Sequence, residues 1–187
     1  MRFKNLSCLN SGLLITSLMV GLVTSQVALA ETQPMFGLRL AMADTDFSGV
    51  ASSASSTTSG FGVVLGVKQP SYRVYADLNF YTWDEVNTRT IHANYDYLWR
   101  ADKSWQVFTG IYGGLVDLEV EAANKYQSGP SAGVQAGLLL PLGSSGWSLE
   151  TGLRYGGFSA KLLNPETNQE VKIKSQAEGF ISLSFSS

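Results

Sequence analysis

Apolar and polar residues alternate along most of the chain after residue 30. From Phe36 to Met42 every second residue is apolar, and the same period of two recurs from Phe61 to Val67 and from Ile91 to Trp99. Successive side chains of a β-strand point to opposite faces, so this period indicates strands with one apolar and one polar face. Clusters of Gly, Pro, Asn, Asp and Ser separate the runs. The pattern predicts an all-β chain.

The runs predict eight antiparallel strands that close into an up-and-down transmembrane β-barrel. We expect the strands near residues 34–43, 59–68, 71–82, 89–99, 104–116, 131–141, 146–160 and 176–186. The connections between them alternate in length, so that long loops and short turns fall at opposite ends of the barrel. This asymmetry is typical of outer-membrane barrels. The predicted loops are residues 44–58, 83–88, 117–130 and 161–175.

Alternation alone does not say which face lies outside. A soluble lipocalin-like binding barrel would turn the apolar face inward, whereas a membrane barrel turns it toward lipid. Six aromatic residues fall at the short-turn end of the apolar face, where they resemble a girdle at a membrane–water interface. The position of these aromatic residues at one end of the apolar face favours the membrane barrel. The girdle comprises Phe36, Tyr72, Trp99, Trp105, Trp147 and Phe185.

The polar face carries many glycines and several charged residues, for which a narrow eight-stranded barrel has little room. We predict a lumenal network among Arg39, Arg73, Asp77, His92, Asp96, Glu150, Arg154 and Glu178. In an antiparallel hairpin the indices of opposite residues have a constant sum, and Arg73 with Asp96 gives the same sum as Asp77 with His92. Charges that lose water inside a barrel should be paired. The alternative is that these charges are solvated separately in a wet lumen.

The first thirty residues are typical of a cleaved signal peptide. Arg2 and Lys4 precede an apolar run from Gly12 to Val23, and a small-x-small cleavage site ends at Ala30. The run is shorter than the ~20 residues that a membrane-spanning helix needs. We therefore expect a signal peptide at 1–30 and a barrel domain at 31–187. The single cysteine, Cys8, leaves with the signal peptide, so no disulfide or thiol chemistry is expected in the mature chain.

The charge balance argues against a nucleic-acid partner. The signal peptide holds two of the 13 basic residues, which leaves 11 against 15 acidic residues and a formal charge of −4. Nucleic-acid-binding domains are usually basic.

The mature chain resembles the small outer-membrane barrels of the OmpA/OmpX and opacity-protein type. The best local match is the last strand, where Gly179, Ile181, Leu183 and Phe185 alternate as in that family's C-terminal assembly signal. In the family the aromatic residue is usually last, whereas two serines follow it here. The resemblance implies a monomer in the outer membrane of a Gram-negative cell. Its implied partners are lipid, lipopolysaccharide and the barrel-assembly machinery, which recognises the C-terminal strand.

No residue pattern predicts catalysis, a cofactor or a metal site. Some small outer-membrane barrels modify lipid A, and the deacylase type places a serine two residues after its histidine. Here His92 is followed by Ala93 and Asn94. Asp117, Glu119 and Glu121 could supply oxygens for a divalent cation, but calcium usually also needs turn geometry and backbone carbonyls, so a solvated acidic loop edge is the favoured interpretation.

The sequence therefore predicts a structural or surface-interaction barrel whose loops contact partners outside the cell. The alternative is a narrow channel or a transporter for small hydrophobic molecules, similar to OmpW. Eight strands leave a lumen that side chains can fill, which argues against a wide pore.

Overall fold

The computed structural model describes residues 32–48, 56–82, 86–99, 104–120, 125–163 and 170–187. The predicted signal peptide, with Cys8, lies outside these residues, so its cleavage stays a prediction. Thr32–Ser187 form one compact unit. No helix among the described residues is long and apolar enough to cross a membrane.

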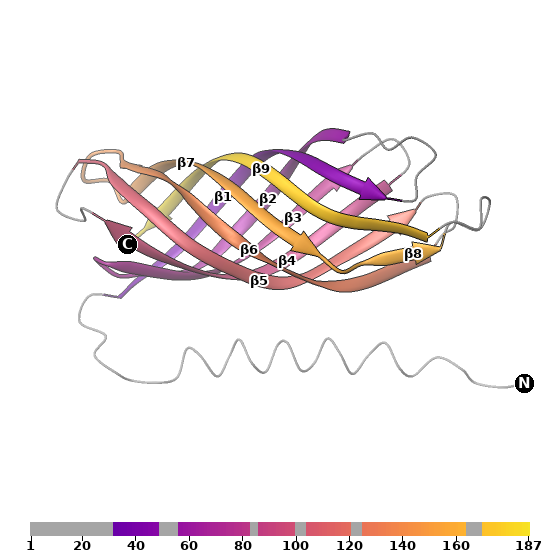
Figure 1. The fold of residues 1–187 in the computed structure, drawn as a ribbon. Coiled ribbons are helices and arrows are strands. Elements are labelled where there is room, and N and C mark those ends of the chain that lie inside the picture. Colours follow the sequence, from indigo (N-terminus) through magenta and orange to yellow (C-terminus); the bar gives the residue numbers. More distant parts are fainter. Residues whose placement is uncertain (1–31, 49–55, 83–85, 100–103, 121–124, 164–169) are drawn as a thin grey trace, which may run out of the picture. The chain divides into compact units, whose positions relative to one another are not determined.

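The described chain forms one closed antiparallel sheet (Figure 1). Each of β1 to β6 pairs with the next strand in sequence, and β9 pairs with both β7 and β1. The short β8 pairs with β9 beyond the end of β7, so β7 and β8 occupy one position in the ring. The predicted eight-stranded barrel is therefore confirmed. The strands are β1 Gln33–Ser48, β2 Ser56–Lys68, β3 Tyr72–Thr82, β4 Val86–Trp99, β5 Gln106–Val120, β6 Lys125–Pro141, β7 Trp147–Phe158, β8 Lys161–Leu163 and β9 Glu170–Ser186.

The strands are staggered around the ring. Direct pairing partners followed from Met35 lead through Gly66 and Tyr75 and back to β1 at Thr45, ten residues further along. Stagger, tilt and diameter are linked in a closed barrel. The tilt is visible in Figure 1, and an eight-stranded barrel of this kind is narrow enough for side chains to fill.

The predicted apolar face lies outside. Leu38, Leu40, Leu65 and Leu153 are 63–70% exposed, whereas their polar neighbours such as Arg39 and Arg154 are buried. This is the opposite of a lipocalin-like barrel, which keeps its apolar face inside. The prediction that the apolar face points outward is confirmed.

The inner face is less polar than the sequence pattern suggested. Beside the predicted glycines and charges it holds bulky apolar and aromatic side chains, because residues of the same parity continue the inner face along each strand. The buried ones include Met35, Val64, Tyr75, Tyr81, Leu98, Phe108, Tyr112, Leu139 and Phe180. The expectation of a small or polar inner face was therefore incomplete.

The predicted loops were too long. β1 continues to Ser48 and β2 begins at Ser56, so most of the predicted loop at 44–58 is strand. Likewise β5 and β6 occupy most of 117–130, and β8 and β9 occupy much of 161–175. These segments are rich in polar residues, but pairing between neighbours satisfies their backbone groups as well as it does in apolar strands. The residual connections at 49–55, 83–85, 121–124 and 164–169 lie outside the described residues.

The two ends of the barrel consequently differ less in connection length than predicted. The β2–β3 connection at 69–71 and the β3–β4 connection at 83–85 are equally short. The two ends are distinguished instead by where the apolar outer surface begins and stops along the strands. Both Thr32 and Ser187 belong to the end that holds the turns 69–71 and 142–146, which we call the turn end (Figure 1).

Candidate functional site

An apolar band, which we call the belt, surrounds the outside of the barrel. Its outward residues run over nine positions on each of three strands, from Ile91 to Trp99, from Val107 to Leu115 and from Trp147 to Tyr155. A tilted transmembrane strand needs about 9–11 residues to cross the apolar core of a bilayer. The belt therefore has the height that a bilayer requires.

Three of the six predicted girdle residues form one aromatic cluster at the turn end of the belt. The ring centroids of Phe36 and Phe185 are 5.4 Å apart, those of Trp147 and Phe185 5.3 Å, and those of Phe36 and Trp147 6.2 Å. The cluster covers the outside of β1, β9 and β7, which the closure of the ring makes neighbours. Sequence spacing could not show this contact, because β1 and β9 are at opposite ends of the described chain.

The other three girdle residues lie apart from that cluster. Tyr72 stacks on Tyr95 at 6.0 Å, and Trp99 meets Tyr97 edge to face at 4.6 Å. Trp99 also donates a hydrogen bond from Nε1 to Thr109 Oγ1 at 3.0 Å, and Trp105 is exposed just before β5. These positions suit a membrane–water interface, where an amphipathic ring can have one edge in water.

Asp77 is the centre of the lumenal network. Its Oδ2 atom accepts from Arg39 Nη1 at 3.0 Å and from Arg154 Nη2 at 2.5 Å. Its Oδ1 atom is 3.2 Å from His92 Nδ1. The amide nitrogens of two asparagines, Asn79 and Asn94, also donate to this carboxylate. A carboxylate buried among so many donors stays compensated although it has lost its water.

A second group of charges surrounds Arg73 closer to the turn end. Arg73 Nε donates to Asp96 Oδ2 at 2.8 Å, and Arg73 Nη1 contacts Glu150 Oε1 at 2.7 Å. Ser184 Oγ donates to the same Glu150 oxygen at 2.8 Å. Register explains the first contact, since β3 and β4 place Arg73 opposite Asp96 and Asp77 opposite His92.

Gln135 joins these two groups of charges. Its Nε2 donates to Asp96 Oδ1 at 2.5 Å and to Tyr75 Oη at 2.7 Å, and its Oε1 accepts from Arg154 Nε at 2.6 Å. Tyr75 Oη in turn donates to Asp96 Oδ2 at 3.2 Å. Tyr75 was not among the predicted network residues, although it has the same parity as Arg73 and Asp77.

Glu178 and Tyr81 form a separate contact near the other end of the lumen. Tyr81 Oη donates to Glu178 Oε2 at 2.7 Å. The eight predicted network residues are all buried, and the structure joins seven of them through Asp77, Arg73 and Gln135. Glu178 is the exception, because it accepts its hydrogen bond from Tyr81.

Aromatic rings pack against the three buried guanidinium groups. Arg39 lies 4.2 Å from the centroid of Phe180, Arg73 4.7 Å from that of Phe108, and Arg154 5.0 Å from that of Tyr112. Such contacts are stronger when the cation has lost water. They also fill the space beside each charged group.

Glycines make room for this interior. A Cβ atom on Gly110 would collide with the Asp96 carboxylate, and one on Gly62 would collide with the Asn79 amide. Neither glycine has a positive φ. The requirement at these two positions is therefore for space, because a side chain at either one would collide with an inward polar group.

His92 bridges the Asp77 group to β6. Its Nε2 atom is 2.9 Å from Ser131 Oγ, and its ring lies 4.9 Å from that of Tyr112. Asp77, His92 and Ser131 thus have the connectivity of a hydrolytic triad. However, the serine is 5% exposed, and Asp77 also binds two arginines.

At the end opposite the turn end, the strands continue beyond the belt as a part of the barrel that we call the projecting wall. There, polar residues point outward and apolar residues point inward, the reverse of the belt. On β1 within the belt Leu40 points out and Arg39 in, whereas further along Asp44 points out and Ala43 in. On β5 the outward Asp117 lies between the inward Val116 and Leu118. The interior of this projecting wall contains the apolar residues Ala43, Val116, Leu118, Phe158, Ala160 and Ile173, beside buried polar residues such as Thr45, Thr88 and Gln176.

This exchange indicates a change of surroundings along the barrel axis. Apolar side chains face out where the surroundings are apolar and in where they are aqueous. The projecting wall therefore has the organisation of a water-soluble barrel, and the belt that of a membrane barrel.

The acidic residues considered for cation binding lie on β5. Asp117 accepts a hydrogen bond from Ser128 Oγ, and Glu119 pairs with Arg89 at 3.7 Å. Glu121 lies outside the described residues. Among the described residues no group of three acidic, His or Cys side chains is placed to hold a metal.

Comparisons with known proteins give the fold. No protein-family model matches the sequence, and no curated protein matches it. Among solved structures, Neisserial surface protein A is similar over 81% of this chain and 96% of its own, with a TM-score of 0.65 and 15% identity. The outer membrane protein OprG from Pseudomonas aeruginosa is similar over 84% and 96%, with a TM-score of 0.50 and 8% identity.

The chain has the fold of the small outer-membrane β-barrels. This likeness fits the belt, the closed ring and the polar interior described above. At such low identity the likeness concerns the fold and not the role of the loops or the lumen.

Proposed function

We propose that the protein is an integral outer-membrane barrel that presents its projecting wall and adjoining connections to partners outside the cell, without catalysis. The main support for this proposal is the exchange of apolar and polar faces at the edge of the belt farther from the turn end. This exchange is expected if one part of each strand lies in lipid and another part lies in water. The neighbours in the comparison are outer membrane or surface proteins by name, which also supports this location.

The contents of the lumen support an anchoring or interaction role over transport. Arg73, Asp96, Gln135 and Arg154 form a continuous layer of contacts across the barrel. Above it the apolar interior of the projecting wall packs together. A channel for small solutes or an OmpW-like path for hydrophobic molecules would need both layers to open.

The Asp77–His92–Ser131 chain supports a structural role over hydrolysis. A nucleophilic serine must reach its substrate and lie beside donors for the oxyanion. Ser131 is buried, and an acyl ester in the membrane would be on the other side of the wall. We assign His92 to the polar network that holds β3, β4 and β6 together.

The proposed partners follow from the surfaces. The belt contacts lipid, and the outer edge of the belt adjoins lipopolysaccharide. The outward Phe185 on β9 would serve recognition by the barrel-assembly machinery. We further propose a monomer, since each of the eight long strands in the described ring pairs with a neighbour on both sides.

Fractionation and gel migration test the location. The mature protein should sediment with outer membranes and migrate faster on a gel before heating than after it, because the closed hydrogen-bonded ring resists detergent. Recovery as a soluble periplasmic monomer would overturn the proposal.

Single cysteines test the orientation. Thr57→Cys places a thiol on the outer surface of the projecting wall, and Ser145→Cys places one in the turn between β6 and β7. A membrane-impermeant maleimide should label Thr57→Cys in intact cells and Ser145→Cys only after the outer membrane is opened. The reverse pattern would mean that the projecting wall faces the periplasm.

Conductance tests the closed lumen. The purified protein in planar bilayers should produce no steady, porin-sized current. Such a current would favour the channel alternative.

A further inference from the structure

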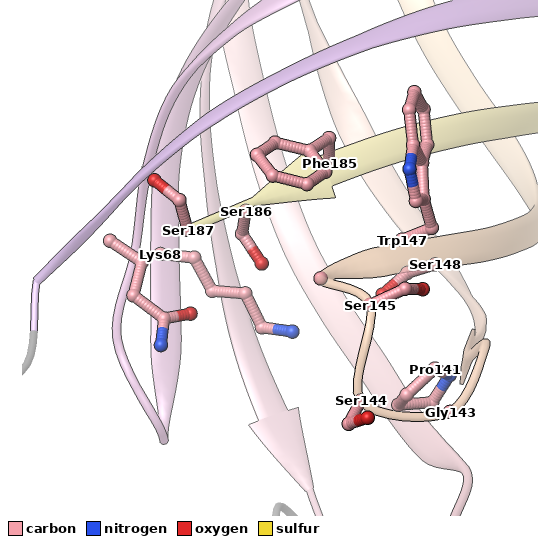
Figure 2. Close-up of a pocket in the computed structure, with 12 residues that line it drawn as sticks. Lys68, Pro141, Gly143, Ser144, Ser145, Trp147, Ser148, Phe185, Ser186 and Ser187 are labelled. Atoms are coloured by element: carbon pink, nitrogen blue, oxygen red, sulfur yellow. The ribbon is translucent and has the colours of Figure 1, made fainter.

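A pocket of about 400 Å³ lies at the turn end of the barrel, beside the Arg73 group of the network and apart from the projecting wall (Figure 2). The turn between β6 and β7 forms one side, and the last residues of β9 form another. The lining is partly polar, with Ser144, Ser148 and Ser186 contributing hydroxyl groups, whereas the Ser145 hydroxyl donates to Leu142 O within the turn. The rest of the lining is Gln33, Lys68, Pro141, Gly143, Gly146, Trp147, Phe185 and Ser187.

The turn has a fixed shape with unused donors. Gly143 and Gly146 have φ angles of 69° and 79°, in the left-handed region that favours glycine. Backbone hydrogen bonds hold Leu142 against Trp147 and Ser186 against Gly146, at 2.8 and 2.9 Å. Among the described residues, the N–H groups of Gly143 and Ser144 donate to no backbone carbonyl. They therefore remain available to an acceptor.

Lys68 supplies a positive charge to the pocket. It is the last residue of β2, and its side chain is half-buried. Its ammonium group makes no hydrogen bond or ion pair with the residues that the structure describes, although Gln69 and Arg73 beside it do. In Figure 2 the Lys68 side chain extends into the space between the turn and the end of β9.

The charged neighbours of Lys68 are Arg73 and Glu150. Arg73 lies directly opposite it on β3, and the carboxylates of Asp96 and Glu150 are both held by that arginine. Arg73 Nη2 is buried without a hydrogen-bond partner among the described residues. Glu150 thus already forms an ion pair with Arg73, and Lys68 forms no ion pair of its own with the described residues.

We propose that this pocket binds a phosphate group, which Lys68 holds by an ion pair. An ammonium group, serine hydroxyls and free turn N–H groups are donors that suit an oxyanion. The proposal goes beyond the proposed function, because it concerns the opposite end of the barrel. The phosphate could come from a phospholipid headgroup or from free phosphate in the periplasm.

The position of the pocket favours a lipid as the source. Trp147 and Phe185 line the pocket and also belong to the aromatic cluster on the belt. A phospholipid whose phosphate meets Lys68 would therefore place its glycerol and acyl chains beside that cluster. Free phosphate would gain nothing from these rings.

Trp147 fluorescence provides a direct readout. In the full-length barrel in detergent, Trp83→Phe, Trp99→Phe and Trp105→Phe leave Trp147 as the only tryptophan. We expect a saturable signal change with dihexanoyl-phosphatidylglycerol below its micelle concentration. Titration with inorganic phosphate distinguishes the sources. Binding of the lipid alone identifies a headgroup, and binding of both with competition identifies a site for phosphate from either source.

Substitutions test whether Lys68 holds the ligand. Lys68→Gln should weaken binding at least tenfold, and Lys68→Arg should restore it to within about threefold. Lys174→Gln, which removes an exposed lysine near the other end of the barrel, is the control and should have no effect. Heat-modifiable migration verifies that each variant is folded. Equal affinity of Lys68→Gln and the parent for both probes would overturn the proposal.

A second pair of variants keeps Lys68 intact. Ser144→Glu introduces a carboxylate at the exposed turn, where it should compete with phosphate for Lys68 and reduce binding at least tenfold. Ser144→Gln introduces a side chain of nearly the same shape as glutamate but without the charge, and this variant should bind as the parent does. If Ser144→Glu binds normally, or if no probe binds the parent, the proposal is wrong.

Discussion

Asp77 on β3 and Arg154 on β7 form an ion pair across the full width of the lumen, with 2.5 Å between Oδ2 and Nη2. Three strands separate β3 from β7 in either direction around the ring. The pair therefore joins opposite sides of the barrel, and Arg39 on β1 binds the same carboxylate from a third direction. This arrangement makes Asp77 the residue on which the closed lumen depends most.

Removing the charge of Asp77 should destabilise the barrel strongly. Asp77→Asn leaves Arg39 and Arg154 buried without their carboxylate, and breaking a buried pair typically costs about 3–5 kcal/mol. Asp46→Asn changes an exposed carboxylate outside the belt and should alter the free energy of unfolding by less than about 0.5 kcal/mol. Urea unfolding in detergent micelles, followed by tryptophan fluorescence, measures both. Similar losses for the two variants would contradict a central role for Asp77.

Arg73 and Asp96 should be energetically coupled. Because Arg73 Nε and Asp96 Oδ2 are in direct contact, a double-mutant cycle on Arg73→Met and Asp96→Leu should give a coupling energy above about 1 kcal/mol. Arg73→Met combined with Asp46→Asn provides a distant pair whose effects should add. A coupling near zero between Arg73 and Asp96 would mean that each charge is solvated separately in the lumen.

Charged residues on the belt should be harmful, but not on the projecting wall. Leu65 and Thr57 both point outward from β2, the first within the belt and the second beyond it. Leu65→Arg should cost about 2–4 kcal/mol because it places a cation in the apolar core of the bilayer. Thr57→Arg should be nearly neutral. Folding into lipid vesicles measures both, and equal effects would show that the belt does not mark the bilayer.

The inward glycines should tolerate no side chain. Gly110→Val would drive a Cβ atom into the Asp96 carboxylate, and such overpacking typically costs about 1–3 kcal/mol. Gly113 is the control on the same strand, because the nearest atom to its Cβ position is Ser131 O at 3.8 Å. Gly113→Val should fold like the parent. The fraction of heat-modifiable protein and the urea midpoint test the contrast, and a stable Gly110→Val would refute the need for space.

The local features of the barrel were predictable because they depend on neighbours in sequence. A period of two assigns Leu38 and Leu40 to one face and Arg39 to the other. A hairpin with a constant index sum places Arg73 opposite Asp96. Loop lengths were not predictable in the same way. Polar segments such as Asp44–Ser48 satisfy their backbone groups equally well in a loop or a strand, and only pairing partners decide between the two.

The sequence by itself determined the strand periodicity, the separation of apolar and polar residues onto two faces and the pairing within the β3–β4 hairpin, because these follow from backbone geometry and the order of residues. Only the tertiary structure decided which distant residues meet. Closure of the ring brought Phe36 to Phe185 and placed Arg154 across the lumen from Asp77. The stagger of the strands sets the height at which inward side chains meet. This stagger results from the registers of all eight strand pairs, including the pair of β1 and β9 that closes the ring. No single segment of the chain encodes it.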